Sequence, residues 1–344
     1  MSTLYLHLGI PKTGTTFLQK VLFPTLSDIC YLSREEINAF LKDRTIDTLF
    51  RYSPSLWQND DKAKGLIAWI AQNAGGHPVL ISEECIHGGQ FPPESKQPFN
   101  DDKADRARRD GYDVCTLARH VAEIQRQCAK HGYPDVKAIV TVRRQDTKLA
   151  SSYAEISSSL RNASQEDFEQ WIRRLLSDKH FYRRSGASKL NYDWFHECLV
   201  RELGEENVFF LPYESLKTSP LSYIDAWCRT LNTTPNESFD WQSRQQVNKK
   251  STGVNTWGIS PPSYLGPRIR PHSSTLDQFG VPNRLWGHWF DWSRGNTIKL
   301  TEDLTGFIMS WYAESNKQLS DKLHGFHLQD FKLPEANYAC VPDR

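Results

Sequence analysis

The residues best suited to chemistry lie at positions 9–16, which read GIPKTGTT. This segment lies between the apolar run LYLHL and the helical pattern FLQKVL, which is the setting of a phosphate-binding loop. Its glycines allow a tight turn and a close approach to a ligand, and the following helix N-terminus offers N–H groups. The loop differs from GxxxxGK[ST], because a threonine follows the second glycine and the lysine lies inside the loop. We expect an anion to be bound by Pro11, Lys12, Thr13, Gly14, Thr15 and Thr16.

A second candidate phosphate site follows a later apolar run, in the segment VRRQDTKLASSY at positions 142–153. Arg143 would leave the tip of a strand, and Ser151 lies eight residues further on, inside the next predicted helix. A guanidinium binds phosphate through two hydrogen bonds, and a serine hydroxyl can add another. Arg144 and Ser152 have the same spacing, so both registers are open.

These motifs require elements that bring them to one edge of a sheet. The apolar pattern predicts strands over residues 4–9, 78–82, 137–142 and 207–211. It predicts helices that begin at Thr15 or Thr16 and that span residues 60–73, 113–131, 145–160, 189–203 and 219–231. The alternation predicts a three-layer, P-loop-like α/β fold, with a central parallel sheet, helices on both faces and an irregular C-terminal extension. Ligands of such folds bind beyond the carboxyl ends of the strands, where both motifs fall.

The segment PKTGTT resembles the 5′-phosphosulfate loop of sulfotransferases that use 3′-phosphoadenosine 5′-phosphosulfate (PAPS), in particular bacterial, carbohydrate-sulfotransferase-like members. Residues 142–153 resemble the family's 3′-phosphate motif, with Arg-Gln in place of the usual Asn-Pro. Residues 207–231 resemble its late strand and Tyr-Glu-x-Leu turn, in which Tyr213 and Glu214 would hold the fold. The resemblance covers residues 3–20 and 137–231, is loose between them, and is faint after 232.

This resemblance implies transfer of a sulfuryl group from PAPS, as co-substrate, to a hydroxyl acceptor, with no metal required. Lys12 would stabilise negative charge as the S–O bond breaks. Arg143 and Ser151 would hold the 3′-phosphate. Lys249 or Lys250, in the segment NKKSTG, would close on the same phosphate; the alternative is a solvated lysine pair.

Attack by a hydroxyl requires a general base. The segment SEECIH at positions 82–87 resembles the Ser-Ser-Glu stretch of bacterial sulfotransferases, with Glu84 at the glutamate. Glu84 is the expected base, and Glu83 would raise its pKa if both are partly buried. His87 is the rival, because histidine titrates near neutrality. A further option is Glu35 or Glu36.

The composition bounds the function more loosely. The chain has 344 residues and a net charge of +1, so nothing drives it as a whole towards nucleic acid. No signal peptide or membrane span is expected, which predicts a cytoplasmic protein. The seven cysteines are scattered and suggest reduced, buried thiols rather than a disulfide frame or a zinc site. His7, inside the first predicted strand, is expected to be a hydrogen-bonded core residue.

The acceptor is the least defined part. We expect a single domain over 1–344, with a PAPS-binding core over 1–240 and an acceptor-side or lid segment over 241–344. Six of the 11 tryptophans lie at positions 241–311, and aromatic faces suit a saccharide or glycolipid, although tryptophans are also frequent in cores. A homodimer is compatible with the sequence. Two other functions stay open: a P-loop kinase that uses ATP and magnesium, and a non-catalytic nucleotide-binding protein.

Overall fold

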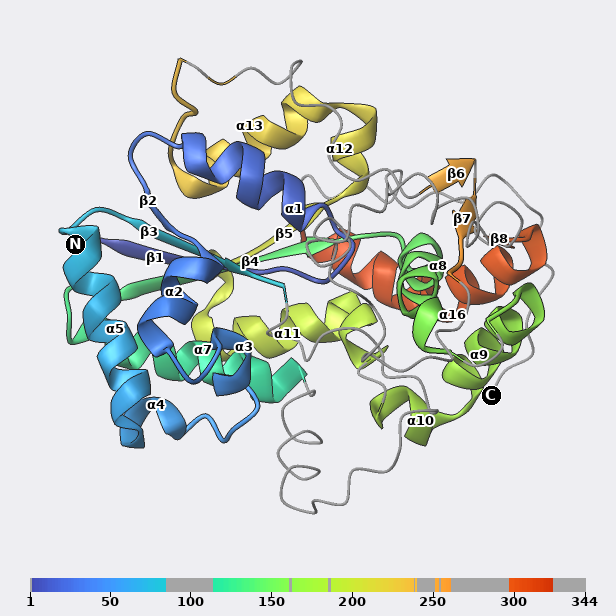
Figure 1. Cartoon of the computed structure of the whole chain (residues 1–344), viewed down its shortest axis with the longest axis horizontal. Coiled ribbons are helices and arrows are strands. Elements are labelled where there is room, and N and C mark those ends of the chain that lie inside the picture. Colours follow the sequence, from blue (N-terminus) through green and yellow to red (C-terminus); the bar gives the residue numbers. More distant parts are fainter. Residues whose placement is uncertain are drawn as a thin grey trace, which may run out of the picture.

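The structure, a computed structural model, places a parallel sheet between two layers of helices (Figure 1). It describes residues 2–84, 114–160, 163–184, 187–237, 239, 251–253, 255–260 and 297–323. Within these ranges, no helix combines the length and the apolar composition that crossing a bilayer requires.

The central sheet has five parallel strands in the order β2–β3–β1–β4–β5. Four of them lie where the sequence predicts strands. The short strand β2 was not predicted, because three residues carry too little pattern. The strands are β1 (Thr3–Leu8), β2 (Cys30–Leu32), β3 (Val79–Glu83), β4 (Asp135–Val142) and β5 (Val208–Pro212).

One helical layer covers the upper face of the sheet in Figure 1. It packs on strand side chains such as Tyr5, Leu80 and Ile139. Its elements are α1 (Thr15–Phe17), the π-helical η1 (Leu18–Leu22), the 3-10 turn η2 (Phe23–Thr25), α12 (Glu214–Thr218) and α13 (Pro220–Leu231).

The second layer packs on the alternate strand residues, among them Leu4, Leu6 and Ile81. Its elements are α2 (Arg34–Leu41), α3 (Ile46–Leu49), α4 (Leu56–Asn59), α5 (Asp61–Ala74), α7 (Val114–Ala129) and α11 (Tyr192–Leu203), with the turn η6 (Glu205–Asn207) leading into β5. Strands with apolar side chains on both faces require both layers. The predicted three-layer α/β fold is confirmed.

A third group of elements extends the molecule beyond the carboxyl ends of the strands (Figure 1). Its helical elements are α8 (Gln145–Ile156), η4 (Ser157–Ser159), α9 (Gln165–Ser177), α10 (Lys179–Arg184), η5 (Ala187–Leu190) and α16 (Glu302–Lys322). A small antiparallel sheet joins them, formed by β6 (Ser251–Gly253), β7 (Thr256–Gly258) and β8 (Thr297–Lys299).

The prediction of an irregular C-terminal extension is wrong for the described part of that extension. Helix α16 has 21 residues, and its Leu304, Ile308 and Leu319 belong to the same hydrophobic cluster as the sheet. Asn316 and Gln145 exchange two hydrogen bonds of 2.7 and 3.1 Å between their buried amides. The helical spacing of the apolar residues was a usable signal for α16.

The prediction that the cysteines are reduced is also wrong for one pair. Cys115 of α7 and Cys198 of α11 form a disulfide, although they are 83 positions apart in the sequence. No local spacing motif announces such a pair, because only the packing of α7 against α11 brings the two residues together. Cys128 and Cys228 are buried free thiols, as expected.

His7 has the structural role that the sequence suggests. Its Nδ1 lies 2.8 Å from Ser82 Oγ, and its Nε2 lies 2.9 Å from Thr141 Oγ1, so it links the three central strands. Trp227 packs edge-on against the ring. Burial lowers the pKa of His7 to about 3, so the imidazole is neutral in the folded protein.

This neutral histidine makes stability depend on pH. Below the ordinary pKa of 6.5, the unfolded chain binds a proton at His7 that the folded chain rejects, so the free energy of unfolding falls as pH decreases. His7→Gln removes a contribution of up to about 1.4 kcal/mol per pH unit, even if it lowers stability at pH 7. Urea unfolding at several pH values measures how the free energy of unfolding changes with pH in wild type and in His7→Gln. The exposed His131→Gln should keep the wild-type slope, and an unchanged slope in His7→Gln would contradict the assignment.

Candidate functional site

The predicted phosphate loop lies between the end of β1 and the start of α1. Its backbone turns through two left-handed residues, Lys12 with φ 72° and Gly14 with φ 82°. The turn is fixed from inside, because the buried Thr13 Oγ1 donates to the carbonyl of Ile10 at 2.6 Å. The carbonyl of Gly14 accepts from the N–H of Phe17 at 2.9 Å, which starts the helix. The loop is therefore a rigid turn that opens a helical segment.

The hydroxyl of Thr15 is the clearest mark of a ligand site in this loop. Thr15 is only 2% exposed, and its Oγ1 has no hydrogen-bond partner among the described residues. A buried hydroxyl without a partner is costly, so native proteins rarely keep one without reason. Its position at the first residue of α1 is where a bound phosphate would accept from it.

Arg143 joins the second motif to this loop. Its Nη1 donates to the carbonyl of Lys12 at 2.8 Å, and its Nε donates to Thr147 Oγ1 at 3.0 Å. The guanidinium lies over the ring of Tyr213, 5.1 Å from the ring centre. Its backbone is held by the buried hydroxyl of Tyr192, which donates to the Arg143 carbonyl at 2.6 Å. The two predicted phosphate motifs thus meet at one place.

Helix α8 turns one stripe of side chains towards the same loop. Thr147, Ser151 and Glu155 are spaced four residues apart and share a face of the helix. Thr147 accepts from Arg143, and the Glu155 carboxylate forms an ion pair with Lys12 Nζ. Ser151 lies between these two contacts along the stripe.

The alternative register has other partners. Arg144 donates from Nε to Asp146 Oδ1 at 3.0 Å, and Ser152 Oγ accepts from Lys148 Nζ at 2.6 Å. Ser152 is fully buried. This arrangement favours Arg143 with Ser151 over Arg144 with Ser152.

The electrostatics of the site are dominated by cations. Lys148 is 1% exposed, and its pKa lies well below the ordinary value, first because of burial and then because Lys189, Arg143 and Lys12 are positive. The negative charge of Glu84 acts on this pKa in the opposite direction. Such a concentration of positive charge suits a ligand with several negative charges.

The predicted bases have different surroundings. Strand pairing puts Leu8 beside Glu83, and Glu84 lies against Gly9, 3.4 Å from the point where a Cβ on that glycine would stand. Glu83 is buried, and Arg34 Nε of α2 lies 3.1 Å from its carboxylate, so a base role has little support.

Glu35 and Glu36, the further candidate bases, lie in the first turn of α2. Glu36 is engaged as a helix cap, because its Oε2 accepts from Ser33 N at 2.8 Å, and Glu35 is exposed. Three predicted residues lie outside the described part of the chain, namely His87, Lys249 and Lys250.

The Tyr-Glu turn after β5 supports the site from the side of the sheet. Glu214 Oε1 accepts from the N–H of Arg144 at 2.9 Å, and burial raises the pKa of this carboxyl. The ring of Tyr213 contacts both Arg143 and Lys217, and the Nζ of Lys217 is 5.4 Å from the ring centre. The sequence analysis missed Lys217, Lys148 and Glu155, although the last two share a helix with Ser151.

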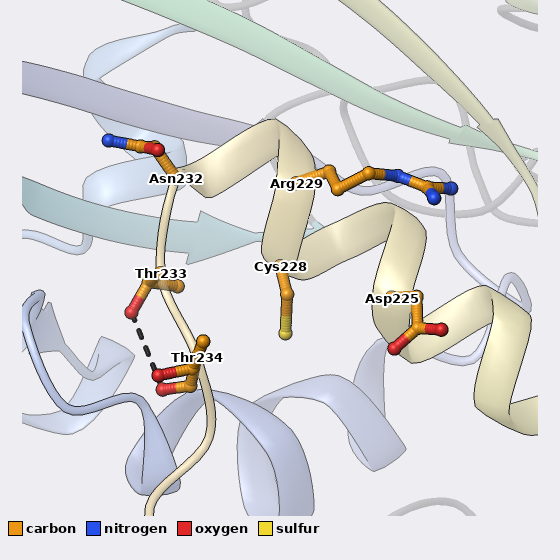
Figure 2. A pocket seen from close by; sticks show the side chains of 6 residues that line it. All are labelled: Asp225, Cys228, Arg229, Asn232, Thr233 and Thr234. Atoms are coloured by element: carbon orange, nitrogen blue, oxygen red, sulfur yellow. Dashed lines mark hydrogen bonds between the residues drawn. The ribbon is translucent and has the colours of Figure 1, made fainter.

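A depression of about 320 Å³ lies elsewhere, at the C-terminal end of α13 (Figure 2). None of the predicted site residues lines it, and the phosphate loop is therefore a separate feature. Its lining residues are Asp225, Cys228, Arg229, Asn232, Thr233 and Thr234.

The sequence matches no protein-family model and no curated protein. Three similar solved structures are all sulfotransferases. The enzyme from Alicyclobacillus acidocaldarius is 14% identical, with a TM-score of 0.39, over 70% of this chain and 86% of that chain. The sulfotransferase domain from the curacin biosynthetic pathway is 14% identical, with a TM-score of 0.38, over 91% and 98%. Mouse sulfotransferase SULT7A1, complexed with PAP, is 13% identical, with a TM-score of 0.39, over 92% and 85%. Likeness at this level leaves donor and acceptor open.

The close contact between Gly14 and Tyr213 gives a test of the loop. A Cβ on Gly14 would lie 2.8 Å from the Tyr213 ring, at a φ that L-residues avoid. Gly14→Ala should lower the free energy of unfolding by about 2–4 kcal/mol, from left-handed strain plus overpacking. Gly75→Ala is the matched control, because Gly75 also has positive φ but has open space around it. It should cost only the strain, about 1–2 kcal/mol. Equal losses in both variants by urea unfolding would argue against the contact.

Proposed function

We propose that this protein is a sulfotransferase that takes the sulfuryl group from PAPS and places it on a hydroxyl acceptor. The observation that carries the proposal is the 2.8 Å hydrogen bond from Arg143 Nη1 to the carbonyl of Lys12. This bond connects the predicted phosphate loop, which contains Lys12, with the predicted 3′-phosphate site, which contains Arg143 and Ser151. The donor carries a 5′-phosphosulfate and a separate 3′-phosphate, so it needs two such anion sites.

The loop is assigned the 5′ end of the donor. Its turn and the first residues of α1 would hold the 5′-phosphate, and the Thr15 hydroxyl would gain a partner there. Lys12 would place its ammonium at the oxygen that bridges phosphorus and sulfur. Negative charge grows on that oxygen as the S–O bond breaks, so a fixed cation there lowers the barrier.

Arg143 and Ser151 are assigned the 3′-phosphate. The Tyr213 ring and the Tyr192 hydroxyl hold Arg143 before any ligand arrives, which reduces the ordering cost of binding. Lys217, whose pKa is lowered by burial and by the charges of Arg143 and Arg144, adds positive charge on the same side.

The acceptor side is proposed more broadly. A hydroxyl of a saccharide or glycolipid would attack sulfur in line, and a carboxylate beside the loop would take its proton. Glu84, predicted as the base, and Glu155 both meet the loop. The segment 241–344 stays the predicted acceptor side.

Calorimetric titration with 3′-phosphoadenosine 5′-phosphate (PAP) tests the donor site. We expect tight binding without metal. Arg143→Ala should weaken PAP binding by about 10–100-fold, because a charge-assisted bond to phosphate is lost. Lys12→Ala should abolish transfer from PAPS. Arg173→Ala is the matched control, since Arg173 is exposed and paired with Asp303.

The same titration with ATP and magnesium separates the alternatives. Binding of ATP–magnesium but not of PAP would replace the sulfotransferase proposal with a kinase. PAP binding without any cleavage of PAPS would indicate a non-catalytic nucleotide-binding protein. An Arg143→Ala variant with wild-type PAP affinity would remove Arg143 from the donor site.

A further inference from the structure

A carboxylate that the sequence analysis did not single out touches the cation of the phosphate loop. Glu155 lies in the last turn of α8, and its Oε2 forms an ion pair with Lys12 Nζ. The Lys12 side chain is 25% exposed and the Glu155 side chain is 32% exposed. The pair is therefore partly exposed to solvent, beside the phosphate loop.

Stability does not explain this position. Partly exposed ion pairs add little to the free energy of folding. A carboxylate on the lysine of an anion-binding loop also opposes the binding of an anion, because it neutralises part of the local charge. The pair of Glu83 with Arg34 differs, since Glu83 is 1% exposed and a buried carboxylate needs a cation.

We propose that Glu155 accepts the proton of the acceptor hydroxyl, an inference that rests on the proposed sulfotransferase function. When the donor is bound, the Lys12 ammonium is drawn towards the bridging oxygen of the phosphosulfate. The Glu155 carboxylate then lies close to the reacting sulfur, because it contacts Lys12 Nζ in the free protein and Lys12 Nζ moves to the bond that breaks. The ion pair thus places a base at the reacting end of the donor.

The step balances without a further reactant. The acceptor oxygen forms a bond to sulfur, and the bond from sulfur to the bridging oxygen breaks. The electron pair of that bond stays on the 5′-phosphate, next to Lys12. The proton of the acceptor hydroxyl passes to the Glu155 carboxylate and then to solvent, to which this side chain is partly exposed.

The surroundings of Glu84 fit a different role. Glu84 lies against Gly9, at the strand end of the loop, and its negative charge raises the pKa of the buried Lys148, which burial and neighbouring cations lower. A carboxylate in that place offsets the positive charge of the cluster. Glu155 instead contacts the Lys12 ammonium, which is the group proposed to stabilise the charge on the bridging oxygen.

The test uses the full chain and two readouts that need no acceptor. One is PAP affinity by calorimetry, and the other is cleavage of PAPS with water as acceptor, followed as release of PAP over a range of pH. Water attacks sulfur by the same route and also loses a proton. The variants are Glu155→Gln and Glu84→Gln. Glu197→Gln is the matched control, because Glu197 is a partly exposed helical glutamate paired with Lys322.

Glu155→Gln should bind PAP several-fold more tightly than wild type, because the negative charge beside the Lys12 ammonium is removed. It should cleave PAPS about 100–10,000-fold more slowly, and the acidic limb of the pH profile should disappear. Glu155→Asp should recover part of the rate. Wild-type PAP affinity and cleavage in Glu197→Gln would show that the effects are local.

If wild type binds PAP and cleaves PAPS, three results would overturn the inference alone. Unchanged or faster cleavage in Glu155→Gln would exclude it as the base. Slower cleavage in Glu84→Gln alone would move the role to that residue. A parallel fall of PAP affinity, cleavage and melting temperature in Glu155→Gln would indicate a structural role. If wild type neither binds PAP nor cleaves PAPS, the proposed function fails and the inference fails with it.

Discussion

The contact between Arg143 and the carbonyl of Lys12 is the constraint on which the site depends. It ties the tip of β4 to a loop that leaves β1, 131 residues earlier in the sequence. The carbonyl can point at Arg143 because Lys12 adopts a left-handed φ of 72°. Without this contact, the two predicted anion-binding motifs would share an edge of the sheet but would have no fixed separation.

The sheet beneath the loop explains why this edge is stiff. His7, Ser82 and Thr141 connect β1, β3 and β4 through their side chains, directly below the turn. The polar groups are mutually satisfied, so they can be buried at the cost of an imidazole that must stay neutral. On the other side, Tyr213 closes against Gly14 and also carries the guanidinium of Arg143. Strand, loop and turn therefore limit one another's positions.

Much of this fold follows from local patterns. Four strands and the helices over α5, α7, α8, α11 and α13 lie close to their predicted positions, because each has a clear apolar period and an end signal. Asp60, for example, caps α5 by accepting from the N–H groups of Lys62 and Ala63, at 3.0 Å each. The disulfide was not predictable in this way, since it depends on the packing of two helices. Strand β2 is simply too short to carry a period.

The candidate site also has parts that follow from local sequence patterns and parts that depend on contacts between distant residues. Residue type and spacing in the sequence predict that Lys12, Arg143 and Ser151 bind anions, and the structure brings the elements that carry them together. The main candidate bases all come from one segment, SEECIH, because a catalytic carboxylate has no sequence motif of its own. The structure separates those carboxylates by partner: Glu83 faces Arg34, and Glu84 faces the charge of Lys148. Such partners lie far away in the sequence.

The position of Lys12 inside the loop explains why the loop contacts both Arg143 and helix α8. A lysine after the second glycine would start the helix and point along the phosphates. At position 12 its backbone is left-handed, its carbonyl is held by Arg143, and its ammonium reaches α8. One residue thus contacts the strand that carries the arginine and the helix that carries Ser151 and Glu155. A ligand that attracts the ammonium must disturb the contact with α8, while the contact with Arg143 can persist. An anion bound at the Lys12 ammonium would therefore change the loop at one end and leave it fixed at the other.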